Sequence, residues 1–307
     1  MKNLKLNSRN VRNGIRKIEK LSIQKVSENS IKNIIADMIK GYKIQTPQYL
    51  EPLTIYRGRI CEKPKKVSEL SYPPSKFVEQ YGRGNCIGQS IFYGATHSSV
   101  PFYELKCKAG DHLALSTWRT NSPLILNHIG FTEEVRGKLK SNRTLEDIYD
   151  FVINTGKYSD LNEMVHEYLG YIFSRPIEDG TDDNYFKLTS VLANIMMQAD
   201  LLNGLIYPTI QMWGNADNIL LKPDYVDKHL EFVNVEYIHI KENDGKGFSI
   251  DRIDSATATT VNEGTLNWSG RPLQWVLSEK GMTATFEYKA DGTWVGKNQD
   301  GEIISPV

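Results

Sequence analysis

The sequence carries most of its information between residues 81 and 104. This stretch reads Tyr81-Gly82-Arg83-Gly84-Asn85, then Ser90-Ile91-Phe92-Tyr93-Gly94-Ala95-Thr96-His97-Ser98-Ser99, then Phe102-Tyr103-Glu104. A Gly-rich turn is followed by a short β-type run that ends in small residues, and Glu104 comes eleven positions after Tyr93. Arg57 lies upstream in another β-type run, Thr54-Ile55-Tyr56-Arg57-Gly58-Arg59. These runs predict adjacent elements that carry an arginine, a tyrosine and a glutamate in that order.

The bulk composition is that of a folded chain without a strong charge bias. Its 307 residues are enough for one large domain or for one domain with appendages. The 37 basic and 37 acidic side chains give a formal net charge of +0, so nucleic acid is not expected as the main partner. The 3 cysteines include no CxxC pair, which argues against a disulfide scaffold and against structural zinc.

Hydropathy gives no reason to expect a membrane protein. No uninterrupted apolar stretch approaches the roughly 18 residues that a spanning helix needs. Residues 1–7 are not followed by the apolar region of a signal peptide, and we therefore expect a cytoplasmic protein. Four histidines show neither an HExxH motif nor pairing at i, i+4, and they are His97, His112, His128 and His166. No metal site is expected from this spacing.

Hydrophobic periodicity predicts helices in two parts of the chain. Residues 8–44 keep a helical period, and Ser27 is expected to cap the second helix of this segment. The segment 144–203 is a further helical block, in which residues 184–202 form the strongest helix. Gly204 is expected to end this helix in the left-handed conformation.

Strands are predicted between and after these helices, so the fold class is α+β. The β-type runs are residues 53–60, 89–96, 103–108, 113–118, 205–210, 218–221 and 232–240. Residues 62–76 are rich in Lys, Pro and Ser, which predicts a loop. From about residue 241 the composition shifts to Gly, Asp, Thr and Asn, which predicts a small β-rich appendage.

The singled-out side chains suit the cleavage of the N-glycosidic bond of a nicotinamide dinucleotide. Positive charge builds on the sugar as the base departs, and Glu104 can stabilise this charge by accepting hydrogen bonds from ribose hydroxyls. Tyr93, or Tyr56 beside Arg57, can stack on the nicotinamide. Arg57 and Arg83 can bind the pyrophosphate, because guanidinium forks match phosphate oxygens. Each residue also has a structural interpretation, with Glu104 at a strand edge, Tyr93 in the core and Arg83 at the surface.

The motifs in this order resemble those of the RES-domain family. The matching segments are Tyr56-Arg57, Gly82-Arg83-Gly84-Asn85, Phe92-Tyr93-Gly94-Ala95 with Glu104, Gly204-Leu205-Ile206-Tyr207-Pro208-Thr209, and Asn218-Ile219-Leu220-Leu221-Lys222-Pro223. The resemblance covers residues 50–240 and implies an ADP-ribosyltransferase-like fold, a split mixed sheet around an NAD cleft. It also implies a toxin of a toxin–antitoxin pair that consumes NAD by hydrolysis or phosphorolysis and is checked by an Xre-type antitoxin. Transfer of ADP-ribose to a protein also occurs in such toxins.

The resemblance assigns a role to each matching residue. The expected catalytic residues are Glu104, Arg57, Tyr93 and Thr209, and the expected NAD-binding residues are Tyr56, Arg57, Arg83, Asn85 and Tyr93. NAD is the substrate, so no cofactor and no metal are expected. Thr209 stands where the family has serine, and threonine keeps the hydroxyl but adds a methyl group and a stiffer rotamer. The expected divisions are an N-terminal helical segment (1–49), a catalytic domain (50–240) and a C-terminal β-rich appendage (241–307).

Two other functions stay open. Cys86 precedes an apolar run and would be the nucleophile of a hydrolase if it lay at a helix start, where the pKa of a thiol is depressed. The base would be His97 or His112, and the residue that orients the base would be Asp111 or Asn127. The chain would otherwise be a non-catalytic module that senses NAD or binds a partner.

Overall fold

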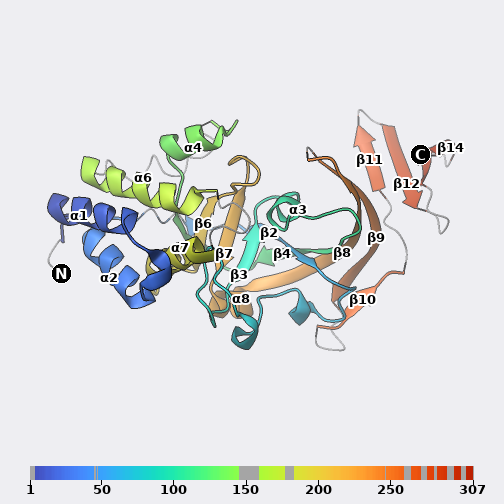
Figure 1. Cartoon of the computed structure of the whole chain (residues 1–307). Coiled ribbons are helices and arrows are strands. Elements are labelled where there is room, and N and C mark those ends of the chain that lie inside the picture. Colours follow the sequence, from blue (N-terminus) through green and yellow to red (C-terminus); the bar gives the residue numbers. More distant parts are fainter. Residues whose placement is uncertain are drawn as a thin grey trace. The chain divides into compact units, whose positions relative to one another are not determined.

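The computed structural model describes residues 4–44, 46, 48–144, 159–176, 183–245, 247–258, 264–270, 275–279, 282–288, 294–298 and 302–306. These residues form seven α-helices and fourteen strands, including a large mixed sheet, which confirms the α+β class (Figure 1). The chain divides into two compact units. The first comprises residues 1–56, 71–104 and 119–231, and the second comprises residues 57–70, 105–118 and 232–307. The expected boundaries after residues 49 and 240 come from composition and resemblance, and they stay predictions.

The first unit contains mixed β-structure with the strand order β1-β5-β6-β7-β3. These strands are β1 (Gln48–Tyr49), β3 (Phe92–Ala95), β5 (Leu124–His128), β6 (Gly204–Pro208) and β7 (Asp217–Leu221). Strands β5 and β6 are parallel, whereas β7 is antiparallel to both of its neighbours, β6 and β3. All of β6 is buried, so the predicted apolar strands at 205–210 and 218–221 form the centre of this sheet.

Gly204 is the first residue of β6 and not the terminator of a helix, so this prediction is wrong. The preceding helix ends at Met196, and the φ of Gly204 is not positive. A Cβ atom at this position would lie 1.9 Å from the carbonyl oxygen of Leu220 on β7. Glycine is therefore needed here because two strand backbones approach closely.

The long helices of the first unit share one hydrophobic core. They are α1 (Ser8–Glu19), α2 (Glu28–Met38), α6 (Asp160–Ser174) and α7 (Asp183–Met196), and Figure 1 shows them grouped together. The Oγ atom of Ser27 accepts a hydrogen bond from the amide of Ser30, so Ser27 caps α2 as predicted. A 3₁₀ turn at Ile23–Lys25 precedes this cap. Residues 145–158 and 177–182 of the predicted helical block lie outside the described residues.

A short helix replaces the strand predicted at residues 103–108. This helix is α3 (Val100–Glu104), and its side chains at Val100 and Phe102 are buried. Pro101 lies in the first turn of this helix, where a missing amide leaves no intrahelical hydrogen bond unmade. Two further helices are α4 (Glu133–Leu139) and α8 (Pro223–His229). None of the described helices has the length and apolar character needed to cross a membrane.

The second unit consists largely of strands. The order of its strands is β2 (Thr54–Ile60), β4 (His112–Thr120), β8 (Leu230–Asn243), β9 (Phe248–Ala258) and β10 (Leu266–Trp268). The first residues of β2 and β8 and the last residues of β4 belong to the first unit. A four-stranded antiparallel sheet follows, formed by β11 (Trp275–Glu279), β12 (Met282–Tyr288), β13 (Trp294–Asn298) and β14 (Ile303–Pro306). The chain after residue 241 is thus β-rich, as its composition predicts. The predicted loop at 62–76 carries 3₁₀ turns at Val67–Glu69 and Ser75–Phe77.

Candidate functional site

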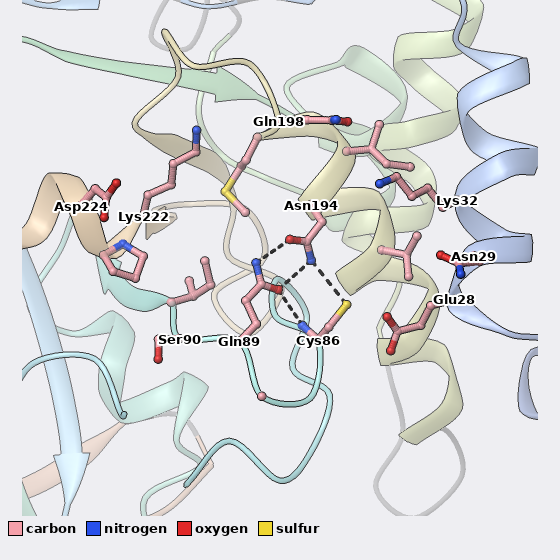
Figure 2. A pocket seen from close by; sticks show the side chains of 16 residues that line it. Glu28, Asn29, Lys32, Cys86, Gln89, Ser90, Asn194, Gln198, Lys222 and Asp224 are labelled. Carbon is pink, nitrogen blue, oxygen red and sulfur yellow. Dashed lines mark hydrogen bonds between the residues drawn. The ribbon is translucent and has the colours of Figure 1, made fainter. Parts of the chain in front are cut away.

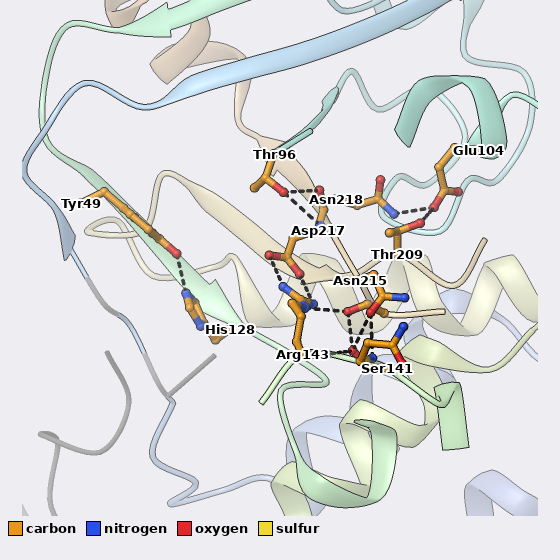
Figure 3. Close-up of polar contacts among 12 residues, drawn as sticks. Tyr49, Thr96, Glu104, His128, Ser141, Arg143, Thr209, Asn215, Asp217 and Asn218 are labelled. Atoms are coloured by element: carbon orange, nitrogen blue, oxygen red, sulfur yellow. Dashed lines mark hydrogen bonds and ion pairs between the residues drawn. The ribbon is translucent and has the colours of Figure 1, made fainter. Parts of the chain in front are cut away.

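The carboxylate of Glu104 forms a polar cluster with two side chains from the central strands. The Oγ1 atom of Thr209 donates a hydrogen bond of 2.5 Å to Oε1 of Glu104, and Nδ2 of Asn218 donates one of 2.7 Å to the same oxygen (Figure 3). Thr209 and Asn218 are buried, whereas Glu104 is exposed. Among the residues that the structure describes, Oε2 of Glu104 accepts no hydrogen bond. One oxygen is therefore fixed, while the other is left for a ligand.

Strand pairing brings these three residues together. Thr209 directly follows β6, and its amide donates to the carbonyl of Ala216 in front of β7. Asn218 is the partner of Tyr207 in the antiparallel register of β6 and β7. The structure thus joins two predicted residues, Glu104 and Thr209, and adds Asn218, for which no separate role is predicted. The methyl group of Thr209 does not prevent the hydrogen bond that its hydroxyl makes.

Tyr93 and Asn85 form a second group, around the Gly-rich turn. The hydroxyl of Tyr93 donates to Oδ1 of Asn85 at 2.7 Å and accepts from the amide of Gly84 at 2.9 Å. A Cβ atom at Gly82 would lie 2.3 Å from Oδ1 of Asn85 and 2.7 Å from the Tyr93 hydroxyl oxygen. The Gly-Arg-Gly-Asn motif therefore closes over the tip of Tyr93, and its small residues have a structural reason.

Arg83 contacts the end of α6. Its Nη1 donates to the carbonyl of Phe173 at 2.5 Å, and both Nη atoms lie 3.4 Å from the carbonyl of Arg175. These carbonyls lack partners within the helix, and a cation is favourable at a helix C-terminus. Among the described residues, Nε–H and one Nη2–H of Arg83 make no hydrogen bond. The guanidinium thus caps α6 and keeps donors for a further contact.

Tyr207 links these groups electrostatically. Burial raises the pKa of the Tyr207 hydroxyl well above its usual value, the negative charge of Glu104 raises it further, and Arg83 opposes the rise. Tyr93 also contributes to the increase. Such effects require proximity, so Glu104, Arg83 and Tyr93 all lie within electrostatic reach of Tyr207. The ring of Tyr207 packs edge-on against Phe173 at 4.8 Å, which holds it in place.

Arg57 and Tyr56 lie on β2, where the chain passes from the first unit to the second. Tyr56 pairs with Ala95 of β3 in the first unit. Arg57 belongs to the second unit, where its Nε donates to the carbonyl of Leu70 at 3.0 Å. The carbonyl of Arg57 accepts a hydrogen bond from Oγ of Ser116 at 2.9 Å. The role of Arg57 toward a ligand stays a prediction.

A salt bridge fixes the loop between β6 and β7. Arg143 binds both carboxylate oxygens of Asp217, at 3.0 and 2.8 Å, and its Nε donates to the carbonyl of Gly214 at 2.7 Å. Burial raises the pKa of Asp217, and the hydrogen bonds and charge of Arg143 counteract this. Asp217 immediately precedes Asn218, so the salt bridge also positions the donor to Glu104. No motif in the sequence marks Arg143.

The same loop exposes a large aromatic side chain. Trp213 is 56% exposed, and its φ of 52° lies in the left-handed region. This conformation costs a non-glycine residue roughly 1–2 kcal/mol. The next amide, that of Gly214, donates to the carbonyl of Thr209 at 2.8 Å. An aromatic surface is thus held in a strained turn that is anchored to the Glu104 cluster.

Cys86 lies in the loop before β3 and not at the helix start that the cysteine hydrolase hypothesis requires. Burial raises the pKa of its thiol, and the hydrogen bond that the thiol donates to Oγ of Ser190 opposes this only in part. Its sulfur accepts from Nδ2 of Asn194 at 3.4 Å. His97, one of the predicted bases, instead hydrogen-bonds Ser99 at 2.7 Å. A raised pKa disfavours the thiolate, which weakens the cysteine hydrolase hypothesis.

The other residues of the cysteine hydrolase hypothesis make contacts within the fold. Asn127 is buried and donates to the carbonyl of Met196 at 2.9 Å. His112 and Asp111 belong to the second unit, where His112 stacks on Tyr237 and Asp111 accepts a hydrogen bond from the amide of Lys108. Within the described ranges, no group of three or more His, Cys, Asp or Glu side chains is arranged to hold a metal ion.

Comparisons with known proteins find no relative of this chain. No family model, no curated protein and no solved structure matches the chain.

Proposed function

We propose that the chain is an NAD-consuming enzyme of the RES type, which cleaves the nicotinamide–ribose bond and so depletes NAD. The observation that carries the proposal is the state of Glu104, an exposed carboxylate with one oxygen held by Thr209 and Asn218. Thr209 and Asn218 converge on this oxygen from two places in the chain, and both lie with Glu104 in the RES-like segments. The proposal includes an ADP-ribosyltransferase-like arrangement of the sheet.

Glu104 has the chemistry that the reaction needs. As the C–N glycosidic bond breaks, its electron pair leaves with nicotinamide and positive charge develops on the ribose. A carboxylate whose orientation is already fixed stabilises this charge without reorganising during the reaction. Oε1 is occupied by its two donors, so Oε2 would accept the ribose hydroxyls. Water or phosphate then bonds to the anomeric carbon and releases a proton.

The other predicted residues would bind the rest of NAD. The open donors of Arg83 would bind the pyrophosphate, and the resemblance implies the same role for Arg57. The ring of Tyr93 stays the proposed wall for the nicotinamide with Tyr56, and Trp213 is a further exposed ring for stacking. Asn85 would act indirectly, because it holds the Tyr93 hydroxyl. Toxicity and control by an Xre-type antitoxin follow from the resemblance alone.

A second candidate is transfer of ADP-ribose to a protein side chain. The exposure of Glu104 favours it, because a protein acceptor must reach the ribose. The bond cleavage and the role of Glu104 are the same in both reactions, and only the nucleophile differs.

The test is release of nicotinamide from NAD, followed by chromatography. The parent is expected to release it, and Glu104→Gln is expected to lose about 99% or more of the activity, as for a lost transition-state contact. Glu167→Gln is the matched control, since Glu167 is an exposed glutamate on α6. Mass analysis of products in phosphate and phosphate-free buffer, with and without an added protein acceptor, identifies the nucleophile.

Two outcomes would contradict the proposal. Full activity in Glu104→Gln would remove the assigned carboxylate. Loss of all activity in a folded Cys86→Ala protein, with Glu104→Gln unaffected, would favour the cysteine hydrolase.

A further inference from the structure

The first unit contains a pocket that none of the residues assigned above to NAD binding or cleavage lines. Its volume is about 820 Å³, and its walls come from α2, the loop at residues 86–91, α7 and the start of α8 (Figure 2). Pockets that bind small molecules typically measure about 300–1,000 Å³. The pocket is therefore large enough for a metabolite, and it is separate from the Glu104 cluster.

An amide pair lies in the middle of this pocket. Gln89 and Asn194 exchange hydrogen bonds through their side-chain amides, and Oε1 of Gln89 also accepts from the amide of Cys86 at 2.9 Å. Asn194 Nδ2 also donates to the carbonyl of Ser190 at 2.9 Å. Among the described residues, one N–H of Gln89 and one lone pair of Asn194 Oδ1 are left unused. The pair thus offers a donor and an acceptor in fixed positions, as Figure 2 shows.

The unpaired charge of the pocket is positive. Lys32 and Lys222 both line it, and neither makes an ion pair with a residue that the structure describes. Lys222 is half-buried and donates only to the carbonyl of Ala199, at 3.1 Å. An ammonium has three N–H donors, so two are left. Burial lowers the pKa of Lys222, the negative charges of Asp200 and Asp224 oppose this only in part, and an anion bound beside the ammonium would oppose it further.

The two carboxylates of the pocket already have partners that favour their charge. Glu28 accepts a hydrogen bond of 2.6 Å from the Tyr81 hydroxyl and is the first residue of α2. Asp224 lies in the first turn of α8. Acidic residues are stabilised by the helix dipole at these positions. Neither carboxylate forms an ion pair with Lys32 or Lys222 among the described residues, so both ammonium groups keep donors for an anion.

We propose that this pocket binds a small anionic metabolite. Lys222, with Lys32 at the opposite end in Figure 2, would hold its carboxylate or phosphate group. The Gln89–Asn194 pair would hold a polar edge of the ligand, and buried side chains such as Ile91 and Val191 would contact its apolar part. The Cys86 thiol, which also lines the pocket, is a built-in reporter of occupancy.

The test combines calorimetry with protection of Cys86 from alkylation, measured on peptides by mass spectrometry. The probes are inorganic phosphate, citrate, adenosine 5′-monophosphate and neutral adenosine, added to the full chain. At least one anion is expected to bind and to slow alkylation of Cys86 but not of Cys61, which is half-buried in the second unit. Citrate and phosphate separate a carboxylate ligand from a phosphate ligand.

Substitutions test whether Lys222 is needed to bind the anion. Lys222→Met is expected to weaken anion binding by about tenfold or more, the equivalent of about 1.4 kcal/mol. Lys228→Met, at an exposed lysine of α8 outside the pocket, is expected to bind like the parent. If Lys222→Met does not fold, Lys32→Met takes its place. Binding of no anion, equal protection by adenosine, or unchanged binding in the folded lysine variant would overturn the proposal.

Discussion

Only one oxygen of the Glu104 carboxylate accepts hydrogen bonds from the described residues. For the orientation of this carboxylate, the hydroxyl of Thr209 therefore matters more than the size of the Thr209 side chain. A hydrogen bond to a charged group contributes about 1.5–3 kcal/mol. Without it, Glu104 keeps only the donor from Asn218 and gains freedom to rotate. The family's serine and this chain's threonine share the hydroxyl, and the isosteric valine removes it.

Thr209→Val is therefore expected to lower kcat for NAD cleavage about tenfold to a hundredfold, with a smaller change in KM. The reason is that, in the proposed reaction, the carboxylate acts on the charge of the transition state rather than on ground-state binding. Thr209→Ser is the control and is expected to retain most of the activity. Steady-state nicotinamide release by both variants, with circular dichroism to check folding, is the measurement. A Thr209→Val enzyme with the kcat of the parent would show that this hydrogen bond has no catalytic role.

At the scale of elements, substitution of glycine tests how closely β6 approaches β7. Gly204→Ala places a Cβ atom 1.9 Å from the backbone oxygen of Leu220, and a backbone atom cannot rotate away. Overpacking of a core typically costs about 1–3 kcal/mol, and we expect the upper end of this range for the free energy of unfolding. Gly137→Ala, in α4 where nothing lies within 4 Å, is expected to stabilise by up to about 1 kcal/mol. Urea unfolding of the two variants measures the change in the free energy of unfolding for each. Equal changes in the two variants would contradict the close approach of β6 and β7 at Gly204.

The elements also show what periodicity can and cannot predict. The helix predicted at 184–202 and the strand predicted at 205–210 are present as α7 and β6, which end at Met196 and Pro208, because apolar spacing decides between helix and strand there. The strand predicted at 103–108 is wrong, since the local alternation conceals the end of the helix α3 (Val100–Glu104). Thr209 was predicted from a motif, but its contact with Asn218 and Glu104 depends on the pairing of β6 with β7. Arg143 and Tyr207 were missed for the same reason, because only tertiary contacts give them a role.

On the scale of the whole molecule, two buried histidines couple stability to pH. His128 on β5 hydrogen-bonds the Tyr49 hydroxyl at 3.0 Å, and His166 on α6 hydrogen-bonds the Tyr42 hydroxyl at 2.7 Å (Figure 3 shows the first pair). Burial lowers the pKa of His128 to about 3, with a contribution from the nearby His166, whose own pKa burial lowers to about 4. Both histidines are therefore neutral in the folded chain at pH 5, whereas they are protonated in the unfolded chain.

The unfolded state binds more protons than the folded state between pH 6.5 and the folded pKa values of about 4 and 3. Stability is thus expected to be complete above pH 6.5 and to fall as the pH is lowered, by up to about 1.4 kcal/mol per pH unit for each histidine. His128→Gln and His166→Asn keep a polar atom for the tyrosine hydroxyls but do not titrate, so their combination is expected to flatten this slope. Asp217 and Glu236, whose pKa values burial raises, oppose the trend equally in both proteins and cancel in the difference. The measurement is urea unfolding at pH 4.5, 5.5 and 7, and identical slopes for parent and double variant would mean that the histidines are not buried in their neutral form.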